Sequence, residues 1–185
     1  MPSIFLSTPI PNGHGWTIVS KFGHILQTAE SKYRERDKSY TILGIEMTST
    51  DNPKIWYPGN CKNVVIQITS SCLNDLNRAV YQVAHESIHC LYPTGNYNPN
   101  YLDEGLATHF SIEYTQANGH GPWSSGDLKY DEALDLVKQL FSIDSDIIKK
   151  LRQIEPCIPL VTKELLLKIN SKISDDLASN LTRKF

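Results

Sequence analysis

The chain has 185 residues, of which 40% are apolar and 21% are charged, and its formal net charge is −2. This length and composition predict one globular domain over residues 1–185, with enough apolar side chains to form a core. The 18 basic and 20 acidic residues nearly balance, without a long run of one sign, which argues against binding to nucleic acid or to an anionic membrane.

Several features favour a cytoplasmic protein. The first residues, "MPSIFLSTPIPNGHGW", have neither the basic start nor the long apolar stretch of a secretory signal. Apolar runs such as "VVIQI" are too short to cross a bilayer. The cysteines show no C-x-x-C spacing, which favours free thiols in a reducing compartment, although the spacing is also compatible with a disulfide. The four cysteines are Cys61, Cys72, Cys90 and Cys157.

The first part of the chain predicts one helix and a small sheet. Residues 1–14 contain three prolines and turn-forming residues, so we expect an extended lead-in. Apolar residues at helical spacing predict a helix over residues 16–37. Runs rich in β-branched residues predict strands at 40–47 and 63–69, and the turn-rich segment "NPKIWYPGN" between them offers a short third strand.

The rest of the chain is helical in pattern. One helix is predicted from about residue 74 to Leu91, where Pro93 and Gly95 end it, and a second from Leu102 to Ala117. The segment 127–185 predicts further helices with a break at "EPCIP". This order predicts an α+β fold with a small mixed sheet, two central helices and a helical C-terminal part.

The first central helix carries His85-Glu86-Ser87-Ile88-His89, which matches the H-E-x-x-H pattern. An α-helix turns by about 100° per residue, so the two histidines lie about 40° apart while the apolar residues occupy the opposite arc. Two imidazoles at this spacing can bind one metal ion, and the glutamate beside them is placed to meet a water molecule at that ion. The alternative interpretation is a surface helix with two exposed histidines.

A catalytic zinc site needs a third protein ligand and one open position. The metzincin pattern is excluded because Tyr92 and Gly95 stand where it requires glycine and histidine. A deformylase-like cysteine ligand would be Cys61 or Cys72, and neither has the glycine-flanked setting of that family. The remaining candidate is Glu104 in "LDEGLATHF" on the second central helix.

The helix around Glu104 has a stripe of small side chains that would let it approach its neighbour closely. An acidic residue in a first helical turn is also favoured by the helix dipole, which is the neutral interpretation of Glu104 but leaves the stripe unexplained. Asp103 points away from Glu104 on the helical wheel, so we expect it to cap or start the helix. The small residues within about 60° of Glu104 are Ala107, Thr108, Ser111 and Thr115.

Together, H-E-x-x-H and the downstream "LDEGLA" resemble the gluzincin branch of zinc metallopeptidases. The size and the order of elements are most similar to the single-domain minigluzincins, and the resemblance covers roughly residues 60–116. It implies a zincin-like fold in which His85, His89 and Glu104 bind Zn²⁺. The chain lacks the G-x-M-E-N segment of the large aminopeptidases in that branch, which favours an endopeptidase.

The resemblance also implies how catalysis would proceed. Zinc would lower the pKa of a bound water towards about 7, and Glu86 would take its proton and later protonate the leaving amine. We expect Thr108, one turn after Glu104, to support a ligand, and Tyr130, after the "GPWSSGD" loop, to donate to the developing oxyanion. Three other residues are weaker candidates for that donor: His109, Tyr114 and His120.

Three functional hypotheses follow from these residues. The first is an intracellular zinc peptidase that acts on a peptide or protein, and the second is a non-catalytic zinc module for regulation or scaffolding. Glu86 argues against the second, because a structural zinc site has no use for it. The third is a regulatory or toxin-like protease that recognises one protein through its C-terminal helices.

Strand 63–69 would either pair with an extended substrate or lie inside the sheet. The sequence leaves the oligomeric state open.

Overall fold

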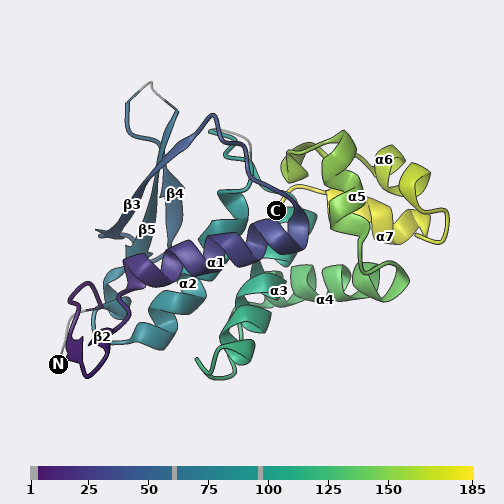
Figure 1. The fold of residues 1–185 in the computed structure, drawn as a ribbon. Helices are drawn as coiled ribbons and strands as arrows, with labels where there is room; N and C mark the ends of the chain where they lie inside the picture. Colours follow the sequence, from purple (N-terminus) through teal and green to yellow (C-terminus); the bar gives the residue numbers. More distant parts are fainter. Residues whose placement is uncertain (1–3, 60–61, 96–97) are drawn as a thin grey trace.

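The structure is a computed structural model that describes residues 4–59, 62–95 and 98–185. Over these ranges the chain has the expected α+β fold, with seven α-helices and a small mixed sheet (Figure 1). None of the helices in the described ranges is long and apolar enough to cross a membrane. The strands are β1 (Pro9–Ile10), β2 (Gly13–His14), β3 (Thr41–Thr48), β4 (Lys54–Trp56) and β5 (Asn63–Thr69). The helices are α1 (Ile18–Tyr33), α2 (Leu76–His89), α3 (Tyr101–Ala117), α4 (Leu128–Ile143), α5 (Ile147–Ile154), α6 (Lys163–Ile169) and α7 (Asp175–Thr182).

The main sheet has the strand order β3-β5-β4, with β3 parallel and β4 antiparallel to β5. The β-branched strand β5 is central, and Val64, Ile66 and Ile68 are fully buried. The strand predicted at 63–69 therefore lies inside the sheet, which excludes its pairing with a substrate as an edge strand. The edge strands are β3 and β4.

The lead-in and the first helix differ in detail from the sequence prediction. Residues 9–14 form a two-stranded antiparallel hairpin, and Ile4 is buried in the core. The helix predicted over residues 16–37 ends at Tyr33, because Arg34 takes a φ of 85°, outside the helical region.

Helix α2 occupies the centre of the fold, where it contacts β4, β5, α1 and α3. Asp75 caps its N-terminus by accepting a hydrogen bond from the Arg78 amide at 2.9 Å, and Asn100 caps α3 in the same way through the Asp103 amide. Helix α3 in turn packs against α4 and α7. The two helices that carry the histidines and Glu104 are thus held next to each other by neighbours on both sides.

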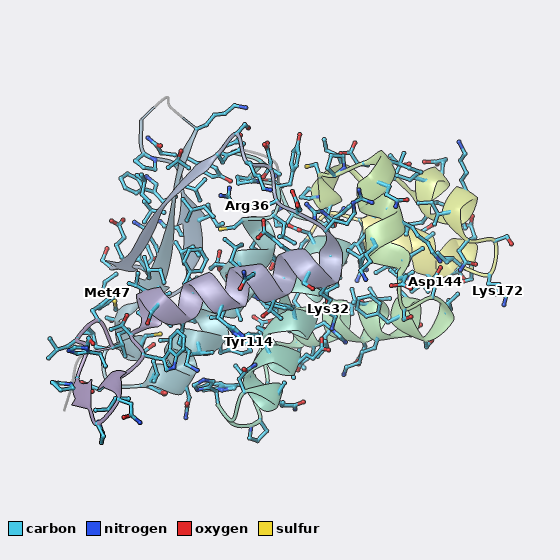
Figure 2. The ribbon with its side chains drawn as sticks, viewed as in Figure 1. Lys32, Arg36, Met47, Tyr114, Asp144 and Lys172 are labelled. Carbon is cyan, nitrogen blue, oxygen red and sulfur yellow. The ribbon has the colours of Figure 1, made fainter. Side chains whose placement is uncertain are left out.

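The C-terminal helices belong to the same core as the rest of the chain. One cluster of buried apolar side chains runs from Ile4 to Leu181. The ion pair of Lys32 with Glu113 joins α1 to α3, and Figure 2 labels Lys32 near the end of α1. Figure 2 also labels Asp144, which accepts a hydrogen bond from Lys150 at 2.6 Å where α4 meets α5.

The cysteines that the structure describes are free and buried. These are Cys72, Cys90 and Cys157, as the sequence favours. Cys90 caps the C-terminus of α2. Cys61 lies outside the described residues.

Candidate metal centre

The structure brings His85, His89 and Glu104 together between α2 and α3. One possible ligand atom from each side chain lies within 4.8 Å of the others. His85 Nε2 is 3.1 Å from Glu104 Oε2, and His89 Nε2 is 3.8 Å from Glu104 Oε1. The two imidazole rings are 5.3 Å apart between centroids, as expected for residues one helical turn apart.

This donor set fits a divalent metal ion such as zinc. Bonds of about 2.1 Å at tetrahedral angles place two ligand atoms about 3.4 Å apart. The 3.1 Å and 3.8 Å distances are close to that value, although each histidine lies nearest to a different oxygen of the Glu104 carboxylate. Imidazole nitrogens with one carboxylate oxygen are ligands typical of catalytic zinc. The same donors also bind other first-row metals, so the ligand types alone do not select zinc.

Asp103 supports His89, contrary to the expectation that it points away from the site. Its Oδ2 lies 3.1 Å from His89 Nδ1. The wheel describes directions around the axis of α3 only, whereas the crossing of α2 over α3 brings His89 against both Asp103 and Glu104. Asn100, rather than Asp103, caps the helix. A proton on Nδ1 that is donated to Asp103 leaves Nε2 free as the ligand atom.

The electrostatics of the cluster favour a cation. Burial disfavours the charged form of His89, but Asp103 and Glu104 outweigh it and raise the pKa of His89 to about 10. Burial likewise opposes ionisation of Glu104, yet His89 and His85 hold the pKa of Glu104 below its ordinary value. A metal ion would supply the same positive charge that a proton supplies here.

Glu86 lies next to this cluster as a buried carboxylate without a hydrogen-bond partner in the described part of the chain. Its residue is 4% exposed, and its side chain accepts no hydrogen bond from any residue that the structure describes. Burial raises the pKa of Glu86, with His89 and His85 opposing that shift. A buried carboxylate that lines a cavity without a partner is placed to hold a water molecule or a substrate group.

Two adjoining cavities meet at the cluster. The first has a volume of about 240 Å³ and is lined by β4, α2, α3 and the turn at 158–160. The second, of about 470 Å³, extends towards Arg78 and Trp123. Because His85, Glu86 and Tyr130 line both, the candidate metal centre lies along a continuous depression.

Tyr130 is the oxyanion-donor candidate that reaches this depression. Its ring lies 5.8 Å from the His85 ring, and burial raises the pKa of its hydroxyl. Its hydroxyl has no hydrogen bond to the described part of the chain. The other three candidates lie elsewhere and line neither cavity. They are His109, which packs on Phe141, Tyr114, which contacts His24, and His120, which contacts Asn77.

Thr108 and Cys72, which were also considered from the sequence, form no hydrogen bond with the cluster in the described residues. Thr108 is buried, but its hydroxyl finds no hydrogen-bond partner in residues 4–59, 62–95 and 98–185, so no hydrogen bond there supports its predicted role. Cys72 contacts Gln82 and Thr69, and it does not belong to the metal-binding group. Cys61 lies outside the described residues.

Gly105, the residue after Glu104, has a packing role that was not predicted from the sequence. A Cβ atom at this position would lie 2.3 Å from the Ala133 carbonyl oxygen and 2.7 Å from Val137. Glycine therefore allows α3 to approach α4, the helix that carries Tyr130. A glycine inside a helical pattern was the available signal, since such a residue usually marks close packing.

No protein-family model, curated protein or solved structure matches the chain. Its function must therefore be inferred from these side chains.

Proposed function

We propose that the chain is a zinc-dependent peptidase of the gluzincin type, which hydrolyses peptide bonds in a peptide or protein. The observation that carries this proposal is the convergence of His85, His89 and Glu104, with Glu86 buried beside them on the same cavity. The order of small sheet, histidine helix and glutamate helix supports the zincin-like fold that the sequence resemblance implies. The three buried free thiols support a reducing compartment, which we take to be the cytoplasm.

A zinc ion held by His85, His89 and Glu104 would polarise the substrate carbonyl and lower the pKa of a water molecule at its open position. The Glu86 carboxylate accepts no hydrogen bond from the residues that the structure describes, so it would be free to accept a proton from the attacking water. The same carboxylic acid then returns the proton to the leaving nitrogen. Asp103 holds His89 in the tautomer that presents Nε2.

Tyr130 and β4 would bind the substrate around the reacting carbonyl. The Tyr130 hydroxyl, which has no hydrogen bond within the described residues, would donate one to the oxygen that gains negative charge. The edge strand β4 lines the first cavity with Lys54 and Ile55. An extended peptide can pair with such an edge through its main chain, which gives binding with little sequence preference and suits an endopeptidase.

The test compares wild type with Glu86→Gln, which preserves size and polarity but removes the base. We expect both proteins to carry one equivalent of zinc by elemental analysis. Hydrolysis of a fluorescently labelled unfolded polypeptide should fall by about 10²-fold or more in the variant. Glu164→Gln, on the exposed surface of α6, is the matched control and should retain full activity.

The outcomes separate the hypotheses. Wild type that contains no metal after purification without chelator would overturn the zinc site. Equal activity in wild type and Glu86→Gln would keep the metal but remove the proposed base. Zinc-loaded wild type without hydrolysis, across a peptide library followed by mass spectrometry, would favour the non-catalytic zinc module.

A further inference from the structure

The segment after α7 returns to the candidate metal centre. Figure 1 shows the chain running from α7 back towards the start of α3. The Tyr101 amide donates to the Arg183 carbonyl at 3.2 Å, and the Phe185 amide donates to the Pro99 carbonyl at 3.0 Å. An antiparallel bridge pairs Asn100 with Lys184. Residues 183–185 are therefore fixed by main-chain hydrogen bonds against the segment that begins the Glu104 helix.

These bonds place the Phe185 ring between two elements of the site. It lies 5.0 Å from the Tyr101 ring, at the first residue of α3, and 4.8 Å from the Tyr130 ring on α4. The ammonium of Lys129 lies 4.2 Å from the centroid of the Phe185 ring. Tilted ring pairs at these distances attract each other beyond their burial of apolar surface.

Aromatic packing contributes to holding the Tyr130 ring in place. Its hydroxyl forms no hydrogen bond with the residues that the structure describes, so no polar contact fixes the ring. Its aromatic neighbours among the described residues are His85, at 5.8 Å between ring centroids, and Phe185, at 4.8 Å. Because His85 belongs to the candidate metal site, Phe185 is the aromatic neighbour that can restrict Tyr130 from outside that site.

We propose that Phe185 is a positioning residue that keeps the Tyr130 hydroxyl directed at the reacting carbonyl, which rests on the proposed peptidase function. Phe185 lines neither cavity, so it is not placed to contact a substrate bound there. Without its ring, Tyr130 can rotate away from the cavity while the metal ligands stay in place. The loss then appears in kcat, because the hydroxyl acts on charge that develops in the transition state, and KM changes little.

A double-mutant cycle tests this role in the full chain. Phe185→Ala should lower kcat by about tenfold, within the range that misplacement of a catalytic group produces. In a Tyr130→Phe background the same change should cost nothing further, because the hydroxyl that it positions is gone. Phe185→Tyr retains the aromatic ring and should have the same kcat as wild type. Leu128→Ala removes an exposed apolar side chain from the same helix as Tyr130 and serves as the control.

Equal losses of kcat in both backgrounds would assign Phe185 a general structural role and overturn the proposal. The proposal would also be overturned if Tyr130→Phe lowered kcat while Phe185→Ala left kcat at the wild-type value. Zinc content and the thermal unfolding midpoint of each variant show whether the fold and the metal site are intact.

A second measurement does not depend on activity. In protein labelled with 3-fluorotyrosine, the ¹⁹F resonance of Tyr130 is identified by its absence in Tyr130→Phe. Phe185→Ala should shift and broaden this resonance, since the ring loses its neighbour and samples more orientations. An unchanged resonance would overturn the proposal even in an active enzyme. A shifted resonance in a protein without peptidase activity would instead support the contact and count against the proposed function.

Discussion

Asp103 leaves the Nε2 atom of His89 available to a metal ion, because its own Oδ2 lies 3.1 Å from Nδ1 and occupies that side of the ring. Removal of such a supporting carboxylate typically costs 10–100-fold in metal affinity. We expect Asp103→Ala to weaken zinc binding by about 10- to 100-fold, and Asp103→Asn by less, because the amide oxygen still accepts a hydrogen bond. Competition with a chromophoric chelator measures the affinity.

Asp176→Asn is the matched control for this prediction. Asp176 lies in the first turn of α7 and is exposed, so its loss removes a helix-dipole contact of the same kind without touching the site. Zinc affinity should stay at the wild-type value in this control. An Asp103→Ala protein that binds zinc as tightly as wild type would show that His89 needs no support.

Local geometry explains which site residues the sequence could indicate. The i, i+4 spacing places His85 and His89 on one face of any helix, whatever that helix packs against. Glu104 follows from its pattern of small neighbours on the next helix. Asp103 could not be assigned in this way, because its contact with His89 depends on the angle at which α2 crosses α3. That angle cannot be derived from the residue spacing within a single helix.

Gly105 sets how closely α3 and α4 approach. A Cβ at this position would meet the Ala133 carbonyl oxygen at 2.3 Å, and a backbone atom cannot move aside as the end of a flexible side chain can. We therefore expect Gly105→Ala to lower the free energy of unfolding by about 1–3 kcal/mol, as overpacking does elsewhere. Urea titration followed by circular dichroism measures this change.

Gly23→Ala provides the opposite case within the same protein. Gly23 lies inside α1, and a Cβ there would have no neighbour within 4 Å. The substitution should raise the free energy of unfolding by about 0.5–1 kcal/mol, because alanine loses less conformational entropy in a helix. If both variants responded alike, close packing of α3 on α4 would not be the reason for the glycine at 105.

Elements with strong periodicity could be predicted, and weakly patterned ones could not. The β-branched run predicted a strand at 63–69, and β5 spans Asn63–Thr69. The helix predicted from Leu102 to Ala117 begins one residue earlier, at Tyr101. The β1–β2 hairpin has two residues in each strand, too few to show alternation. The strand order β3-β5-β4 depends on contacts between segments and has no local signature.

At the scale of the whole molecule, the C-terminal helices stabilise the fold that carries the site. The guanidinium of Arg152 on α5 uses all five of its N–H donors on backbone carbonyls. Their oxygens belong to the end of α1, the end of α2 and the break after α5. They are the carbonyls of Tyr33, Arg34, Glu35, Leu91 and Pro156.

This network changes how the hypothesis of target recognition by the C-terminal helices can be tested. Deletion of residues 144–185 would remove Arg152 and the Phe185 contact together with any recognition surface. Lost cleavage after such a deletion would therefore report on folding as much as on recognition. Substitutions of exposed side chains such as Ile154, which is 63% exposed, are the appropriate probes of recognition.

Arg152→Met tests how much this network contributes to stability. Methionine fills similar space but removes the donors, and the loss costs about 1–3 kcal/mol for a buried carbonyl and less for one that water can reach. Leu91 still accepts a hydrogen bond from the Asp37 amide, and the remaining carbonyls except that of Tyr33 belong to exposed residues. We therefore expect a total loss of about 1–3 kcal/mol, mainly from the Tyr33 carbonyl. Arg152→Lys should lie between wild type and methionine, because lysine offers three donors.

Urea titration measures these differences in the free energy of unfolding. The control for the loss of a positive charge is Lys149→Met, at an exposed position on the same helix. This control should change the free energy of unfolding by less than about 0.5 kcal/mol, as is usual at exposed positions. Arg152→Met with wild-type stability would mean that the five carbonyls are hydrated without cost when the guanidinium is absent. The ends of α1 and α2 would then be held by apolar packing alone. The side chain of Arg152 on α5 would not be needed for stability and could contribute to binding a partner instead.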